Sequence, residues 1–532
     1  MPEIIRRRLR RAWSVLVEEG LPAFFRRVRR HFRRHREYRL WLRQRPGVGG
    51  HQPDVEIGAE GALFSVLMPT YDTPEQWLRA AIESVRRQTW LRWQLCIADD
   101  ASTRPDVRRV LEEYRSADPR IRVVFRPVNG HISAASNSAL ELASGEFVAL
   151  LDHDDELAPH ALERVATEIT RWPQADLLYS DEDKLDERGR RVGPYFKPDW
   201  NPDLFLSQNF LSHLGVYRTA LVRAVGGFRL GFEGSQDYDL ALRVVAPSAP
   251  ERVRHVPDVL YHWRMIPGSA ALRPGEKTYT QDAALRAIQS FLEGASPRAR
   301  AEPGFPPFYR VRYPVPDPPP RVSVLRFGED PARLNRAAAD ADGDVLVFLG
   351  ASSEPTKGDW LDELVSHACR PEVGVVGGRV LDRRGRIVHA GYLLALDRDP
   401  PVVSAHQGFH RTDPGQMGRA QLVQNFLAVS GDCLAVRREV FLEAGGFDNA
   451  SFPRHLHDVD LCLRLRERGL RVVWTPHAEV ESRASASAAS RTGIFDRAAQ
   501  ATLRRRWGSR IHVDPYWHPA LSRENGDFSL AP

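Results

Sequence analysis

The sequence has few cysteines and no long apolar run, and both absences exclude whole classes of protein. Its four cysteines are scattered over 532 residues and form no C-x-x-C pair, so neither a disulfide framework nor a zinc site is expected. No stretch approaches the ~20 apolar residues that cross a bilayer, and the first residues lack the apolar core of a signal peptide. We therefore expect an intracellular protein without a membrane span, long enough for at least two domains.

Glycine-rich phosphate-binding loops are also absent. No G-x-G-x-x-G follows the first predicted strand, and no G-K-S or G-K-T occurs. This argues against a dinucleotide-binding domain and against a P-loop enzyme. A bound nucleotide would have to be held in another way, through a metal ion.

Basic charge is abundant but confined to one end. Residues 1–45 hold 15 arginines and no lysine against four glutamates, a net +11, whereas the whole chain is +6 and the remainder is therefore −5. Aromatic residues such as Trp13, Phe24, Tyr38 and Trp41 are interleaved with the arginines, which is typical of a helix on an anionic membrane surface. A helix packed on its own domain and a nucleic-acid contact are the alternatives. No nucleic-acid-binding motif accompanies the arm, so we expect no nucleic-acid partner and a peripheral position on the cytoplasmic face of the membrane.

From residue 64 onward, predicted strands and helices alternate. Such alternation predicts an α/β fold with an open, mostly parallel sheet and helices on both faces. The predicted strands are "FSVLMPTY", "WQLCIADD", "RIRVVFRP" and "GEFVALLD". In such sheets ligands bind beyond the carboxyl ends of the strands. The polar residues at these ends are therefore the candidates for a site: Thr70, Tyr71, Asp99, Asp100 and Asp152 to Asp155.

The chain repeats itself after a proline-rich segment. Residues 295–321 contain nine prolines and no helix or strand period, which predicts an extended linker. On either side, "LLDHDDEL" and "FLGASSEP" align with a constant offset of 198, and "SQNFL" precedes a "GGF" as "VQNFL" does. This predicts an internal duplication. The expected parts are an arm (1–61), a first domain (62–294), the linker (295–321), a second domain (322–518) and a tail (519–532), and the shorter second copy is expected to lack the first two strands.

Acidic residues are crowded at the end of the fourth predicted strand. Asp152, Asp154 and Asp155 place negative charge so densely that a cation is the natural partner. Carboxylates together with substrate phosphates are the usual ligands of Mg²⁺ and Mn²⁺. Asp99 and Asp100, after a neighbouring strand, could accept hydrogen bonds from a base and a ribose. A solvated loop or a run of helix-capping acids is the alternative.

Three ordered stretches of the first copy resemble the family 2 glycosyltransferases, which have the GT-A fold. They are "PTYDTPEQWLRAAIESVRRQTWLRWQLCIADDAST", "NGHISAASNSALELASGEFVALLDHDDEL" and "GFEGSQDYDLALRV". The stretch from Asp176 to Arg218 is similar to tandem-domain members associated with bacterial O-antigen and other cell-surface polysaccharides. The resemblance implies a GT-A domain, with a mixed and mostly parallel sheet, followed by a truncated GT-A-like copy. It also implies an inverting transfer from a nucleotide-diphosphate sugar to a glycan or lipid-linked glycan, with Mg²⁺ or Mn²⁺ as cofactor.

The resemblance assigns roles to the residues that match its donor-site motifs. Asp152 would face the ribose and the metal, and Asp154 would ligate the metal that bridges the diphosphate. Asp155 and His262 are further metal-ligand candidates. The nucleotide-sugar-binding set is Pro69, Thr70, Tyr71, Asp99, Asp100, Asn137, Asp152 and His153.

The acidic pair before the family's "DL" helix appears here as Gln236 and Asp237. Asp237 is the candidate general base that takes the proton from the acceptor hydroxyl. Trp200, Gln236 and Asp239 are expected on the acceptor side. Structural alternatives remain: Asp237 and Asp239 as acids favoured at a helix N-terminus, and Trp200 and His262 as core residues.

The second copy has lost the acid cluster. Its D-x-D positions read Gly350, Ala351, Ser352 and Ser353, although Asp458 persists over Asp237. We expect the first copy to perform the chemistry and the second to serve packing or acceptor binding. A nucleotidyltransferase and a non-catalytic glycan-assembly scaffold are the alternative functions. The first should show a glycine-rich basic loop that "MPTYDTPEQ" lacks, and the second would not need acids at three element ends.

Overall fold

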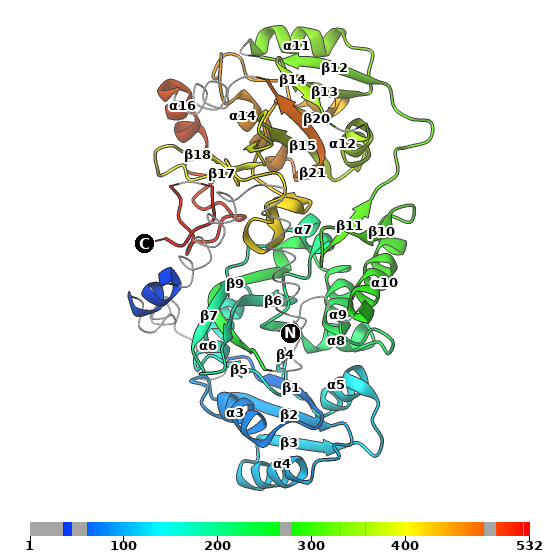
Figure 1. The fold of residues 1–532 in the computed structure, drawn as a ribbon, viewed down its shortest axis with the longest axis vertical. Coiled ribbons are helices and arrows are strands. Elements are labelled where there is room, and N and C mark those ends of the chain that lie inside the picture. The colour runs from blue at the N-terminus through cyan, green and yellow to red at the C-terminus, as the bar shows by residue number, and fades with distance from the viewer. Residues whose placement is uncertain are drawn as a thin grey trace.

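The computed structural model describes residues 36–44, 61–266, 278–328, 330–356, 358–483, 496–524 and 526–531. These residues form two α/β domains stacked along the long axis of the molecule (Figure 1). Each domain is built on a mixed sheet, which confirms the predicted fold class. No helix in the described residues is long and apolar enough to cross a membrane.

The first domain contains a nine-stranded sheet in the order β3-β2-β1-β4-β8-β6-β9-β5, with β7 paired to β6. In this sheet β1 pairs in parallel with β2 and β4, and β2 pairs in parallel with β3, whereas β8 pairs with β4 in the antiparallel direction. The strands are β1 (Phe64–Thr70), β2 (Trp93–Asp99), β3 (Ile121–Phe125), β4 (Phe147–Leu150), β5 (Glu156–Leu157), β6 (Leu177–Leu185), β7 (Arg191–Tyr195), β8 (Gly215–Arg218) and β9 (Val253–Arg264).

Helices cover both faces of this sheet and form two separate apolar cores. In α3 (Glu75–Arg86), Leu78, Ala81, Ile82 and Val85 are buried, because residues three, four and seven apart share one helical face. The other helices are α4 (Pro105–Ala117), α5 (His131–Leu142), α6 (Ala161–Arg171), α7 (Pro202–Ser207), α8 (Thr219–Ala224), α9 (Gln236–Val245), the 3₁₀ helix η1 (Pro250–Arg252) and α10 (Thr278–Ala295).

The proline-rich segment is not an extended linker throughout, contrary to the sequence-based prediction. Its β10 (Arg300–Pro303) and β11 (Tyr309–Arg312) form an antiparallel hairpin. Most of its prolines lie in the turn or beyond the strands, where a missing N–H does not interrupt the ladder. Val311 is buried in the core of the first domain. Burial of the hairpin's apolar residues thus makes it an extension of that domain.

The second domain has an eight-stranded sheet in the order β12-β13-β20-β15-β21-β14, with β16 paired to β15 and β19 paired to β21. Its strands are β12 (Val322–Phe327), β13 (Val345–Gly350), β14 (Ser353–Pro355), β15 (Val373–Leu381), β16 (Ile387–His389), β19 (Gln424–Asn425), β20 (Cys433–Arg437) and β21 (Arg471–Ser482), with a separate pair β17 (Tyr392–Leu394) and β18 (Val402–Ser404). Its helices are α11 (Pro331–Asp340), α12 (Trp360–Ala368), the 3₁₀ helix η2 (Gln416–Gln421), α13 (Arg438–Glu443), α14 (His457–Glu467) and α16 (Arg497–Trp507).

Strand register supports the internal duplication. Phe147 of β4 pairs with Arg218 of β8, and Val345 of β13 pairs with Arg437 of β20. Phe147 and Val345 are 198 residues apart, so the offset found in the sequence also relates equivalent positions of the two sheets. Glu156 and Glu354, also 198 apart, each lie opposite the long last strand of their sheet. Gly350 to Ser353 therefore occupy the places of Asp152 to Asp155.

The second copy retains a counterpart of the first strand, which the sequence spacing predicted to be missing. β12 pairs in parallel with β13 as β1 pairs with β4. The sheet ends there, so the strands that are missing are the counterparts of β2 and β3. Because β12 needs only six residues and α11 begins four positions later, both fit into the short stretch before Asn335.

Buried polar contacts join the two domains. The Asn201 side chain donates to the Asn425 carbonyl (3.1 Å) and accepts from the Asn425 N–H (2.9 Å). Asp203 of α7 forms an ion pair with Arg370 (2.6 Å), and the Asn425 amide donates to the same aspartate (2.7 Å). Since buried polar groups need all their partners, these contacts fix how the domains pack.

Candidate active site

The carboxyl ends of β1, β2 and β4 meet at one edge of the first sheet. Thr70 at the end of β1 pairs in register with Asp99 at the end of β2. His153, just after β4, places its Nδ1 3.1 Å from the Pro69 carbonyl oxygen. The residues predicted from three separate strands therefore lie next to one another at this edge, and Tyr71 is 45% exposed.

The two acids after β2 differ in their availability. Asp100 is already bound, because the Arg126 Nε (2.8 Å) and the Gly130 N–H (3.0 Å) both donate to its carboxylate. Asp99 is buried, and its Oδ1 has no hydrogen-bond partner in the described part of the chain. Burial raises the pKa of Asp99, and hydrogen bonds from Ser102 lower it. Of the pair, Asp99 is the acid with a free acceptor for a ligand donor.

The acids after β4 also differ in whether their carboxylates already have hydrogen-bond partners. Asp155 is 1% exposed and accepts from the Tyr261 hydroxyl (2.7 Å) and the Arg264 N–H (2.7 Å), so it ties the loop to β9. Asp152 and Asp154 are half-buried. Their backbone groups form hydrogen bonds: the Asp152 N–H donates to the Tyr261 hydroxyl, and the Arg264 Nε donates to the Asp154 carbonyl. Their carboxylates accept no hydrogen bond from the described residues.

The pKa of Asp152 depends on several neighbouring charged groups. Burial raises the pKa of Asp152, the charges of Asp154 and Asp237 raise it further, and His213 and His153 lower it. The charges of Asp154 and Asp237 thus both act on Asp152. A hard divalent cation fits this oxygen donor set and would relieve the repulsion.

Asp237 lies in the first turn of α9 and is half-buried. The Asn209 amide donates to its Oδ2 (2.9 Å), which orients the carboxylate and leaves the other oxygen available. Asp239 is 1% exposed and is clamped by Arg229 and by Arg243 (2.7 Å). Gln236 accepts from the Gly234 N–H (2.8 Å) at the start of the helix.

Two other predicted residues have scaffold contacts. The Asn137 amide donates to the Phe228 carbonyl (2.8 Å) and accepts from its N–H (2.8 Å). In the second copy, Asn335 makes the same pair with Phe447 (2.8 and 2.9 Å). Trp200 is half-buried and packs against aromatic neighbours of the first core.

The structure brings His213, rather than His262, to the acids. His262 points to the other face of β9, where its Nδ1 lies 2.6 Å from Asp183. The next residue toward the site is Tyr261, and His213 stacks on its ring with centroids 4.5 Å apart. A shift of one residue along a strand reverses the face. The sequence contains no local signal for His213, because the position of its ring on Tyr261 depends on how β8 and β9 are placed.

In the second copy, the counterpart of the nucleotide site is filled. Phe327 occupies the position of Pro69 in the strand register and packs against Phe348, Phe447 and His457. A Cβ on Gly431 would lie 2.2 Å from the Phe327 ring, so the backbone and the ring are in close contact. The Asp458 carboxylate accepts hydrogen bonds from the Gly431 N–H (3.0 Å) and the Val459 N–H (2.9 Å).

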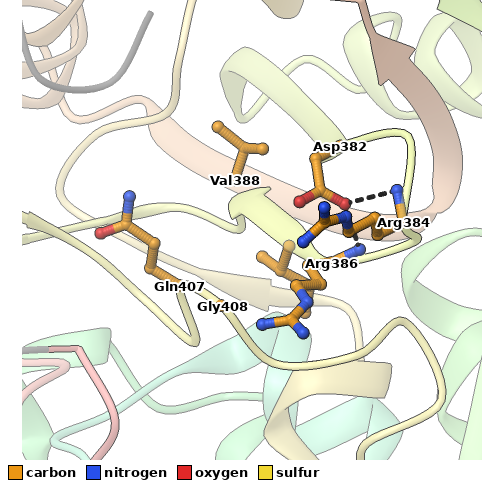
Figure 2. A pocket seen from close by; sticks show the side chains of 7 residues that line it. Asp382, Arg384, Arg386, Val388, Gln407 and Gly408 are labelled. Carbon is orange, nitrogen blue, oxygen red and sulfur yellow. Dashed lines mark hydrogen bonds between the residues drawn. The ribbon is translucent and has the colours of Figure 1, made fainter. Parts of the chain in front are cut away.

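A cavity of about 240 Å³ opens elsewhere on the second copy, at the β15–β16 hairpin. Figure 2 shows Arg384 and Arg386 beside Asp382. The Asp382 carboxylate accepts from the backbone N–H groups of both arginines (2.8 and 2.9 Å), so it serves the turn. The cavity is not the counterpart of the D-x-D site.

Among the described residues, one trio of possible metal ligands comes within 4.8 Å, namely Asp181, His255 and His518. All three are buried. The trio lies on the face of β6 opposite Glu182, which contacts Ser212 near the predicted site. It is therefore separate from the D-x-D acids.

Comparison with known proteins relates both copies to one family. Residues 65–225 match the model "Glycosyl transferase family 2", and residues 318–509 match "Glycosyltransferase like family 2". "Uncharacterized protein y4gI" of Sinorhizobium fredii is 38% identical over 93% of this chain and 61% of its own length. "O-antigen biosynthesis protein RfbC" of Myxococcus xanthus is 33% identical over 93% of this chain and 43% of its own. The chain thus spans less than two thirds of either relative.

Other relatives match smaller shares of the chain. "Putative colanic acid biosynthesis glycosyl transferase WcaA" of Escherichia coli is 29% identical over 37% of this chain and 72% of its own. The structure of S. aureus TarS 1-349 in complex with UDP-GlcNAc is 22% identical, with a TM-score of 0.36, over 44% of this chain and 67% of that one. With models of the same family matching both copies, the chain belongs to the family 2 glycosyltransferases.

Proposed function

We propose that the chain is an inverting, metal-dependent glycosyltransferase whose first copy transfers a sugar from a nucleotide-diphosphate sugar to a bacterial cell-surface glycan. The observation that carries the proposal is the position of Asp152 and Asp154 directly after β4, at the carboxyl edge of the first sheet, where the charges of Asp154 and Asp237 raise the pKa of Asp152. The relatives named for O-antigen and colanic acid biosynthesis support a surface polysaccharide as the product.

Each residue of the site has a task in this proposal. Asp99 accepts hydrogen bonds from the nucleoside, and Thr70, whose buried hydroxyl has no partner in the described residues, lies beside it. Asp152 and Asp154 would hold Mg²⁺ or Mn²⁺, which would supply positive charge to the departing nucleoside diphosphate. Asp237 takes the proton from the acceptor hydroxyl as that oxygen attacks the anomeric carbon.

Asn209 supports the base by orienting it. Its amide donates to Asp237 Oδ2 at 2.9 Å, so Oδ1 is the oxygen assigned to accept the proton. A base that acts on the face opposite the leaving group produces inversion in one displacement. The acceptor is therefore expected to enter on the side of α9.

A screen of donor turnover tests this function. Purified protein is incubated with a panel of UDP-, GDP-, dTDP- and CMP-linked sugars, with Mn²⁺, with Mg²⁺ or with EDTA, and released nucleotide is measured. We expect release from one donor class, lost with EDTA. A non-catalytic scaffold would release nucleotide from none of them.

We further propose that the basic arm attaches the protein to the cytoplasmic face of the membrane, where a lipid-linked acceptor is presented. Residues 1–35 lie outside the described residues. The helix at 36–44 packs on the first domain, with Tyr38 and Trp41 buried and Trp41 5.3 Å from the Phe196 ring. The membrane contact is therefore assigned to residues 1–35.

Vesicle flotation tests the arm. Deletion of residues 1–35, which spares Tyr38 and Trp41, should abolish flotation with anionic vesicles, and 0.5 M salt should release the full chain, because surface charges are screened within a few ångströms. Equal flotation of both proteins with neutral vesicles would contradict an electrostatic anchor.

A further inference from the structure

Three consecutive acids of β6 point alternately to its two faces. Asp181 and Asp183 contact histidines on one face, and Glu182 contacts Lys197 and Ser212 on the other. All three acids are at most 6% exposed. A buried carboxylate is energetically costly without polar partners. Each of the three acids therefore needs such partners on its own face of β6.

Asp181 is held by donors from three separate parts of the chain. The Lys197 N–H donates to its Oδ1 (2.9 Å), and the His255 Nε2 lies 3.0 Å from the same oxygen. The His518 Nε2 lies 2.7 Å from Oδ2, a close polar contact that does not have the angle of a hydrogen bond. His518 belongs to the chain end, beyond the last helix of the second copy, and Figure 1 shows this red segment beside the helix at 36–44.

The positions of the histidine protons indicate that Asp181, His255 and His518 are held together by polar contacts and do not bind a metal. This trio is called the clamp below. The His518 Nδ1 accepts from the Ala520 N–H (2.9 Å), so the ring proton is on Nε2, the nitrogen beside Asp181. A metal would need a lone pair on that atom. The two nitrogens of His255 face Asp181 and Asp199, each at 3.0 Å. Burial alone would lower the pKa of His255, but the charge of Asp181 raises it to about 9.

Lys197 connects this clamp to the donor site. Its backbone N–H is held by Asp181, and its Nζ, fully buried, contacts Glu182 (3.3 Å) and the carbonyls of Leu211 (3.1 Å) and His213 (2.5 Å). His213 is the residue whose ring stacks on Tyr261 beside the D-x-D acids. A continuous set of buried contacts therefore runs from the chain end to the site.

We propose that His518, carried by the segment after the second copy, is a positioning residue for the donor site of the first copy. By fixing Asp181 it fixes the backbone of Lys197, whose ammonium group holds the carbonyl of His213 in place. The proposal rests on the proposed function. It also gives the second copy a task, which is to deliver the chain end to β6, where Pro515 accepts a hydrogen bond from the Asp199 N–H (2.8 Å).

Hydrogen exchange in the full-length protein tests the positioning without any nucleotide. His518→Leu and His518→Asn both remove the Nε2 donor, whereas His518→Gln keeps an N–H that can reach Asp181. We expect exchange at residues 212–214 to become on the order of tenfold faster in the first two, the scale of one lost buried polar contact. His518→Gln should restore it. The matched control is His389→Leu, a buried histidine whose Nε2 lies 3.7 Å from Asp432, also in the second copy.

Titration with UDP, GDP and dTDP, each with MnCl₂, provides the second readout. His518→Leu should weaken binding of the nucleotide that the wild type prefers by about tenfold, and His389→Leu should not. Exchange at residues 212–214 equal in His518→Leu and His389→Leu would overturn the proposal. So would a stoichiometric metal in the wild type that is lost in His518→Leu. Failure of every nucleotide to bind, with the exchange result intact, would reject the proposed function and leave the clamp.

Discussion

Asp154→Asn is expected to abolish binding of a nucleoside diphosphate in Mn²⁺ while the protein stays folded. The carboxylate has no partner in the described residues, and the contact with Arg264 uses the backbone carbonyl, which asparagine keeps. A ligand at 100 times its dissociation constant stabilises a protein by about 2.7 kcal/mol. Thermal unfolding with and without nucleotide should show that this stabilisation disappears.

Asp155→Asn is the matched control for that variant. The Asp155 carboxylate accepts from Tyr261 and Arg264 (both 2.7 Å), so its loss should cost about 1–3 kcal/mol of stability. Its folded fraction should still bind nucleotide. A folded Asp154→Asn protein with wild-type affinity in Mn²⁺ would refute the metal site.

Asp237→Asn is expected to lower kcat by about 10²-fold or more with the donor KM nearly unchanged, since general-base catalysis contributes on that scale. Asparagine has the same shape and can still contact Asn209, but it cannot take a proton. Steady-state kinetics with the donor found by the screen provide the measurement.

Asp239→Asn separates catalysis from helix structure. Asp239 lies two positions away on the same helix and is paired with Arg229 and Arg243. Its replacement should lower the unfolding temperature and leave kcat within a few-fold. Turnover at the wild-type rate in Asp237→Asn would end the assignment of the base.

The sequence predicts the α/β alternation and the placement of acids at strand ends, because both depend on local periodicity. It cannot tell Asp99 from Asp100, since the difference arises from Arg126 on the neighbouring chain segment. It also favours His262 over His213. The β6–β9 ladder shifts register at Asp181, and a single shift decides which side chain of a strand faces the site.

Contacts between distant segments account for the remaining differences. The hairpin at 300–312 forms because its apolar residues meet the first core, which no local period reveals. The loss of the donor site in the second copy is visible in the sequence at Gly350 to Ser353, but the filling of its space by Phe327 is not. Tyr38 and His518 meet acids of the same strand from opposite ends of the chain.

Calorimetric titration with the active nucleotide sugar in Mn²⁺ tests most directly whether one copy does the chemistry. We predict one site per chain, abolished by Asp154→Asn and retained in Asp458→Asn, because Asp458 is occupied by backbone N–H groups. Two sites per chain, or binding that survives Asp154→Asn and is lost in Asp458→Asn, would contradict the assignment of the donor site to the first copy.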